Sequence, residues 1–137
     1  MRSRRVGIST FRHLLAEHCS ASAALIALPD VAKSAGVQDY SICPEGLIVA
    51  ELKAGAAAGA VLLAQSDPDY PQALLDLSDG PPLLWVMGRQ DLLYQPTVAI
   101  VGARNASSLG SRMAKGLATE SGADGYVVVS SLARGVD

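Results

Sequence analysis

Apolar residues in the first sixty positions recur three and four apart, which is the spacing of one face of an α-helix. Phe11, Leu14 and Leu15 show this pattern, and Thr10 is a suitable N-cap for the helix that contains them. Pro29-Asp30 is expected to end a second helix, whereas Pro44 fits the first turn of a later one, where its missing N–H costs nothing. The pattern predicts helical segments at 10–19, 20–28, 31–35 and 44–58.

From residue 60 onward the apolar residues form short uninterrupted runs bounded by Pro and Gly, which is typical of buried strands. Strands are predicted at 60–64, 83–87, 97–101 and 126–130. A helical turn is predicted at 72–77 and a helix from residue 108 to Ser121, with Gly122 ending it. Strand, glycine turn, helix and strand form a βαβ unit with parallel strands. The predicted class is α/β, with a helical domain at 1–60 and an α/β domain at 61–137.

Composition is compatible with one ordinary domain or two very small ones, because the chain has 137 residues of which 50% are hydrophobic. A net charge of −2 excludes a histone-like basic protein. Cys19 and Cys43 are too few for a disulfide scaffold or a four-ligand zinc site, so a reducing, cytoplasmic setting is expected. No apolar run has the length of a membrane span, and no membrane association is expected.

Charge is unevenly distributed, and the positive charge lies close to the glycine-rich motifs. Residues 1–16 hold four arginines and no acid, residues 17–79 hold nine acids, and residues 80–137 hold five basic residues. Gly102 follows an apolar strand and precedes a helix whose N-cap candidates are Ser107 and Ser108. Free N–H groups at such a helix start, together with Arg104, suit an anion.

The segment 130–137 repeats this arrangement of hydroxyls, arginine and glycine after the next strand, and it ends with an acid, Asp137, placed to cap a following helix. In a parallel sheet the two loops would lie side by side at the carboxyl ends of their strands, where α/β sheets bind ligands. From the residues alone, a purely structural role for these glycine turns is as compatible with the pattern as a phosphate or nucleotide site. The spacing matches neither G-x-G-x-x-G nor a Walker loop.

Catalytic and metal-binding groups are scarce. His13 and His18 are five residues apart and do not share a helix face, and neither cysteine has a lysine or arginine neighbour that would mark a nucleophile. Trp85 is interpreted as a packing anchor rather than a base-stacking platform. The sequence predicts no acid–base pair, no metal site and no organic cofactor.

Four motifs in order resemble the bacterial DNA-processing protein A (DprA, or Smf) family and together cover residues 67–137. They are Asp69-Tyr-Pro-Gln-Ala-Leu74, Pro81-Pro-Leu-Leu-Trp-Val-Met-Gly88, Val98-Ala-Ile-Val-Gly-Ala-Arg-Asn-Ala-Ser107 with Gly110, and Val129-Ser-Ser-Leu-Ala-Arg-Gly-Val-Asp137. The helical first 60 residues resemble the family's small N-terminal domain, which is similar to a sterile-alpha-motif (SAM) or helix-hairpin-helix fold.

The resemblance implies an extended Rossmann-like domain that binds single-stranded DNA. It also implies a homodimer that protects incoming strands and helps to load the recombinase RecA during natural transformation, without established catalysis. Carried over by position, the phosphate-binding pocket would be lined by Gly102, Arg104, Ser107, Gly110, Ser130, Arg134 and Gly135. A backbone-phosphate site of this kind implies sequence-tolerant and salt-sensitive binding.

Three departures from the family pattern bear on this expectation. Ser131 stands where the family usually has glycine, and Leu109 stands where an aromatic residue is common. The chain ends at Asp137, whereas the family's sheet continues, so that 61–137 is expected to be a truncated Rossmann-like domain with parallel strands short of cover. Marginal stability, and aggregation through the apolar window 127–132, are therefore expected.

Two other functions remain open. The first is a phosphoribohydrolase-like enzyme that processes nucleotides on a similar scaffold; this chain lacks the Pro-Gly-Gly-x-Gly-Thr-x-x-Glu motif which that chemistry needs, but release of free base would support it. The second is an interaction module whose N-terminal helices bind a partner while the glycine turns are purely structural.

Overall fold

The computed structural model describes residues 1–131 and 133–136, and it divides into two compact units, Met1–Gly88 and Arg89–Asp137. Leu132, in the apolar window, and Asp137, the expected helix cap, lie outside the described residues. The division into domains at residue 60, predicted from the sequence, stays a proposal.

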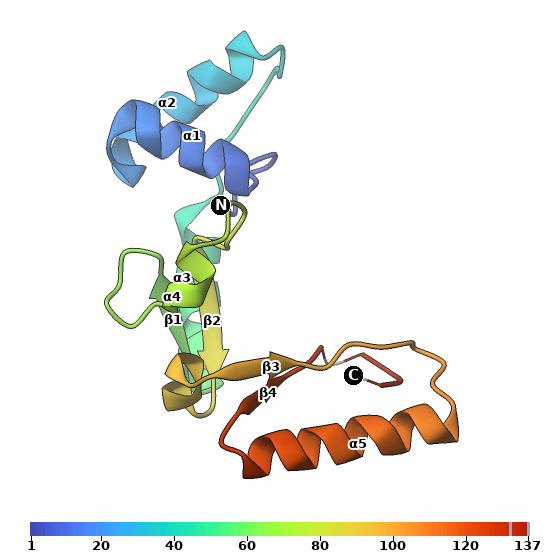
Figure 1. Cartoon of the computed structure of the whole chain (residues 1–137). Helices are drawn as coiled ribbons and strands as arrows, with labels where there is room; N and C mark the ends of the chain where they lie inside the picture. Colours follow the sequence, from blue (N-terminus) through green and yellow to red (C-terminus); the bar gives the residue numbers. More distant parts are fainter. Residues whose placement is uncertain (132, 137) are drawn as a thin grey trace. The chain divides into compact units, whose positions relative to one another are not determined.

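The first unit begins with three helices, α1 (Ile8–His18), α2 (Ala21–Ser34) and α3 (Glu45–Ala57), shown in Figure 1. The prediction that Thr10 caps the first helix was wrong, because the N-cap of α1 is Gly7, which forms no side-chain cap. Ser20 does cap α2, since its Oγ accepts a hydrogen bond from the Ala23 amide at 3.1 Å. These helices confirm the helical character predicted for the first sixty residues.

The prediction that Pro29 ends the second helix was also wrong. Segments 20–28 and 31–35 belong to one helix, and Pro29 lies inside it. The buried residues Ala24, Leu28 and Ala32 explain this result, because their spacing of four places them on one helix face across the proline. Their burial keeps the chain helical although Pro29 provides no N–H for the Leu25 carbonyl.

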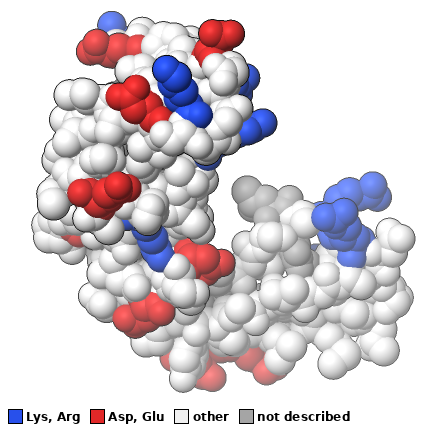
Figure 2. All heavy atoms as spheres, turned by 90° about the horizontal axis from the view of Figure 1, so that it is seen from above, with Lys and Arg blue, Asp and Glu red and all other residues white. Residues whose placement is uncertain are grey.

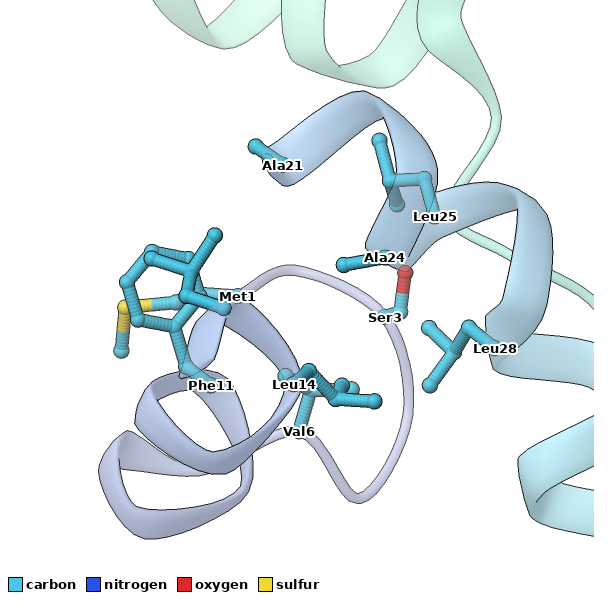
Figure 3. Close-up of a pocket in the computed structure, with 10 residues that line it drawn as sticks. Met1, Ser3, Val6, Phe11, Leu14, Ala21, Ala24, Leu25 and Leu28 are labelled. Atoms are coloured by element: carbon cyan, nitrogen blue, oxygen red, sulfur yellow. The ribbon is translucent and has the colours of Figure 1, made fainter. Parts of the chain in front are cut away.

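The core of the helical region is small. Leu14 of α1 packs with Ala24 and Leu28 of α2, and Val6 and Tyr40 cover this cluster. Beside it lies a cavity of about 90 Å³ lined mainly by apolar side chains, among them Phe11 (Figure 3). A cavity of this size is well below the several hundred Å³ of ordinary ligand pockets, so we interpret it as incomplete core packing.

Within 1–131 and 133–136, no single helix is long and apolar enough to cross a membrane; α1 and α2, bent by 109° where they meet, pass this test of length and composition only as a pair.

The first unit ends with an antiparallel strand pair, β1 (Ala60–Ala64) and β2 (Leu83–Met87), in which Leu62 faces Trp85. Trp85 packs so closely on Gly55 of α3 that a Cβ there would overlap the indole ring, which supports its interpretation as a packing anchor. The short helix α4 (Gln72–Leu75) and buried Tyr70 lie in the connection between the strands. Arg12 of α1 donates hydrogen bonds to the carbonyls of Ser78 and Gly80 in the same connection.

The second unit contains the predicted βαβ arrangement: β3 (Thr97–Ala99), α5 (Ser108–Ala123) and β4 (Val127–Val129). The two strands are parallel, with Val98 opposite Val128, which confirms the prediction. Each strand is two residues shorter than predicted, and α5 continues two residues beyond Ser121. A short 3₁₀ helix, η1 (Gln90–Tyr94), was not predicted. The four strands of the described chain form two separate two-stranded sheets within an α/β fold.

Candidate functional site

The carboxyl ends of β3 and β4 are joined by hydrogen bonds that continue the sheet beyond both strands. The Ile100 amide donates to the Val129 carbonyl at 2.9 Å, and the Ser130 hydroxyl donates to the Ile100 carbonyl at 2.7 Å. The loops that leave these strands therefore start next to each other. The Ser130 hydroxyl donates its proton in this bond and so has a structural role. Toward a ligand it can therefore act only as a hydrogen-bond acceptor in this conformation.

The two glycine loops pack directly on each other. The Val136 amide donates to the Ala103 carbonyl at 3.3 Å. A Cβ on Gly102 would lie 2.5 Å from the Val136 Cβ, and a Cβ on Gly135 would overlap the Ala103 carbonyl oxygen and lie 2.7 Å from the Arg104 Cα. Gly135 also has a φ of +111°, which strongly favours glycine. The prediction that these loops lie side by side is confirmed, and their contact explains both glycines.

The N-terminus of α5 follows the first of these loops. Ser107 caps it, with its Oγ accepting from the Gly110 amide at 3.1 Å, as predicted. The helix geometry leaves the Ser108 and Leu109 amides of the first turn without intrahelical acceptors. A Cβ on Gly110 would make only an ordinary contact, 3.5 Å from the Ser107 Oγ, so the backbone does not require glycine there. The helix start thus offers free donors and the positive end of the helix dipole.

Positive charge gathers at this end of the second unit. Arg104 and Arg134 are exposed in the two loops, and Arg112 and Lys115 lie in the first half of α5, whereas Glu120 lies in its second half. In the described chain none of these four basic residues forms an ion pair. Figure 2 shows a group of Lys and Arg atoms at the right, with no Asp or Glu atoms among them on the face shown.

Arg112 and Lys115 lie beyond the first turn of α5, where the influence of the helix dipole has largely fallen off, so their charge acts on a ligand rather than on the helix. Arg89 is a contrasting case in the same unit, because it pairs with Asp91, and this hydrogen bond lowers the pKa of the Asp91 carboxyl.

Sequence reasoning missed part of this site. Ala103 and Val136, which join the loops, had no recognisable signal because they are small apolar residues in loops. Arg112 and Lys115 could have been found from their position in the first two turns of a helix that Ser107 caps. Of the two departures from the expected pattern, Leu109 is 57% exposed at the helix start and Ser131 is exposed after β4.

Other hollows and clusters do not carry comparable chemistry. A groove of about 700 Å³ in the first unit lies beside the Arg2–Glu51 ion pair and Trp85, with mostly apolar walls that include Leu52 and Leu83. Among the residues that the structure describes, no group of three or more His, Cys, Asp and Glu side chains could hold a metal ion.

Comparison with known proteins identifies relatives for both parts of the chain. The profile of the DprA-like N-terminal HHH domain matches residues 1–54, and that of DNA recombination-mediator protein A matches residues 61–137. Protein Smf of Synechocystis sp. (strain ATCC 27184 / PCC 6803 / Kazusa) is 37% identical over 79 residues, which are 55% of this chain and 20% of that protein. DNA processing protein DprA of Streptococcus pneumoniae (strain ATCC BAA-255 / R6) is 40% identical over 75 residues, 52% of this chain and 25% of that protein.

The fold has a solved counterpart. The X-ray structure of DNA processing protein A (DprA) from Streptococcus pneumoniae matches with a TM-score of 0.57 and 26% sequence identity, over 92% of this chain and 45% of that one. The resemblance inferred from the four motifs is therefore confirmed. So is the fold class, a small N-terminal helical domain followed by an incomplete Rossmann-like part. The chain spans less than half the length of these relatives.

Proposed function

This chain belongs to the DNA recombination-mediator protein A family, and we propose that it binds single-stranded DNA through backbone phosphates held at the paired glycine loops. The residues proposed to line the site are Gly102, Arg104, Ser107, Gly110, Ser130, Arg134 and Gly135. In this proposal the two arginines contact phosphate oxygens, Ser107 and the first-turn amides of α5 donate hydrogen bonds, and the glycines allow the loops to pack.

The observation that carries the proposal is the contact between the two loops, through the Val136–Ala103 hydrogen bond and the close approach of Gly135 to Arg104. Because of this contact, an arginine from each loop starts beside the other loop's backbone and near the start of α5. A guanidinium group matches the geometry of phosphate oxygens better than an ammonium does. Neither these two arginines nor Arg112 and Lys115 of α5 are neutralised by an acid within the described chain, so their charge is available to a polyanion.

The site is suited to binding rather than to reading bases or to catalysis. Arginines, hydroxyls and backbone amides contact phosphates without regard to sequence. We therefore propose sequence-tolerant, salt-dependent binding and no catalytic activity. By family membership we further propose that the protein acts in the cytoplasm as a homodimer, protects incoming DNA and helps to load RecA onto it during natural transformation.

The proposal is tested by fluorescence-anisotropy titration of a labelled oligo-dT strand at rising salt. We expect saturable binding that weakens with salt, and a strong loss of affinity in Arg104→Ala. Lys53→Ala removes the same charge from an exposed position on α3 and serves as the matched control, which should bind like the wild type. Equal affinity of Arg104→Ala and wild type would favour an interaction module with structural glycine turns.

Two further assays separate the finer parts of the proposal. Incubation with nucleoside monophosphates should release no free base, and release would favour the phosphoribohydrolase-like alternative. RecA retained on the oligonucleotide should increase when this chain is added, and an unchanged amount would argue against recombinase loading.

A further inference from the structure

The first unit carries a second arginine pair, Arg4 and Arg5, at the tip of a hydrogen-bonded turn. The Val6 amide donates to the Ser3 carbonyl at 3.2 Å, which closes a four-residue turn with the two arginines in its middle. Both arginines are exposed. The proposed function does not use them.

The turn is anchored on both sides by a side chain and a backbone amide from a distant part of the sequence. The Tyr40 hydroxyl donates to the Arg4 carbonyl at 2.7 Å, and the Cys43 amide donates to the Ser3 hydroxyl at 3.1 Å. Ser3 itself is only 7% exposed. The backbone that presents the two arginines is therefore held in place against the helical unit, although it lies close to the start of the chain.

Arg5 has a backbone conformation that its side chain disfavours. Its φ is +62°, at the third position of the turn, where glycine or asparagine is usual. The two other non-glycine residues with positive φ have ordinary explanations: Cys19 terminates α1, and Asp39 is a residue type that tolerates this region. Unfavourable conformations that the surroundings maintain cluster at ligand-binding and other functional sites.

Nothing in the fold uses the two guanidinium groups. Within residues 1–131 and 133–136 neither group has an ion-pair or hydrogen-bond partner, whereas Arg2 pairs with Glu51 and Arg12 binds the Ser78 and Gly80 carbonyls. No acid occurs in residues 1–16. Of the four arginines in this segment, Arg2 and Arg12 thus contact other parts of the fold, whereas Arg4 and Arg5 remain available to a ligand.

We infer that the Arg4–Arg5 turn is a second phosphate-binding site, which contacts the phosphodiester backbone of a single-stranded nucleic acid. Two adjacent guanidinium groups on a fixed backbone favour phosphate groups over a diffuse counter-ion cloud. A membrane surface fits less well, because interfacial binding grows with the apolar area inserted beside the charge. Ser3 and Val6, which flank the pair, are buried and half-buried and offer little such area. The choice of nucleic acid as the partner rests on the proposed function.

The test compares Arg4→Gln/Arg5→Gln with Lys33→Gln/Lys53→Gln in the full chain. The control removes the same charge from exposed helical positions of the same unit. Affinity for oligo-dT is measured as a function of salt. Loss of two single-strand phosphate contacts should reduce the salt slope by about 1.4, which corresponds to a change of about sevenfold in the affinity ratio between roughly 50 and 200 mM salt. The control should keep the wild-type slope, and an equal slope in both variants would overturn the inference.

Arg5→Gly separates binding from folding. Glycine adopts a φ of +62° freely, so the midpoint of thermal unfolding should rise while affinity for oligo-dT falls. Unchanged affinity in a stabilised Arg5→Gly variant would contradict a phosphate contact at this turn.

Failure of this inference is distinguishable from failure of the proposed function. If Arg104→Ala weakens binding and the turn variants do not, only the inference about the turn fails; the reverse result supports the turn and contradicts the loop site. The last measurement is binding of the same variants to vesicles that contain phosphatidylglycerol. Binding to them that depends on Arg4 and Arg5, without an effect on oligo-dT, would overturn the assignment of nucleic acid as the partner.

Discussion

Gly135→Ala is the change that most directly tests the contact between the two glycine loops. Two independent penalties act at this position. Forcing a non-glycine residue to a φ of +111° costs roughly 1–3 kcal/mol. The added methyl group would also overlap the Ala103 carbonyl and the Arg104 backbone, and overpacking of this kind costs roughly another 1–3 kcal/mol.

Gly125→Ala isolates the backbone term. Gly125 also has a positive φ, +86°, but an added Cβ there would meet no atom within 4 Å. Gly125→Ala should therefore lower the free energy of unfolding by only about 1–3 kcal/mol, and Gly135→Ala should lower it by about 1–3 kcal/mol more. Urea denaturation followed by circular dichroism gives both differences in the free energy of unfolding.

Binding provides the decisive comparison between these two variants. Under conditions where both are folded, Gly135→Ala should bind oligo-dT more weakly, because its loop cannot stay against Arg104. Gly125→Ala should bind like the wild type. Equal stability losses in the two variants, or full binding by Gly135→Ala, would refute the reasoning that loop packing creates the site.

Three other changes test separate parts of the structure. Ser107→Ala should cost about 1 kcal/mol of unfolding free energy through loss of the α5 N-cap, and an unchanged urea midpoint would contradict the capping bond. Pro29→Ala should stabilise the protein by about 1–3 kcal/mol, because the Leu25 carbonyl regains a helical donor; destabilisation would show that the proline ring is needed for packing. The hydrogen bond from Arg2 lowers the pKa of Glu51 in the folded state. The stability that this ion pair contributes is therefore fully present above the unfolded-state pKa of about 4.3, and it is lost as the pH falls through the lower folded-state pKa. The melting temperature of the wild type should thus fall more steeply below about pH 4 than that of Glu51→Gln, and parallel curves would argue against this ion pair.

Local signals were sufficient where one residue type determines one structural feature. Ser107 at the start of an apolar-periodic segment correctly predicted an N-cap, and the order of strand, glycine turn, helix and strand correctly predicted a parallel βαβ pair. The apolar runs at 60–64 and 83–87 correctly predicted two strands. In these places the preference of the backbone and the tertiary structure agree.

Predictions failed where packing overrides local preference. Pro29 is a strong helix breaker, but the buried face of Ala24, Leu28 and Ala32 extends across it, and that face depends on contacts with α1 that no local pattern reveals. The apolar run also led to a predicted strand that continued to Val101. In the structure β4 pairs over only three residues, so β3 ends earlier and Val101 is 80% exposed. Similarly, the loop contacts of Ala103 and Val136 arise from the pairing of distant segments.

The central claim is that Arg104, together with the loops beside it, binds the phosphates of single-stranded DNA. The most direct measurement is the titration of labelled oligo-dT with the wild type and with Arg104→Ala over a series of salt concentrations. If the four basic residues at this end of the second unit contact phosphates, they should contribute about −3 to the wild-type salt slope, and Arg104→Ala should reduce the size of the slope by about 0.7 together with the affinity. Salt-independent binding, or identical slopes and affinities for the two proteins, would contradict the account.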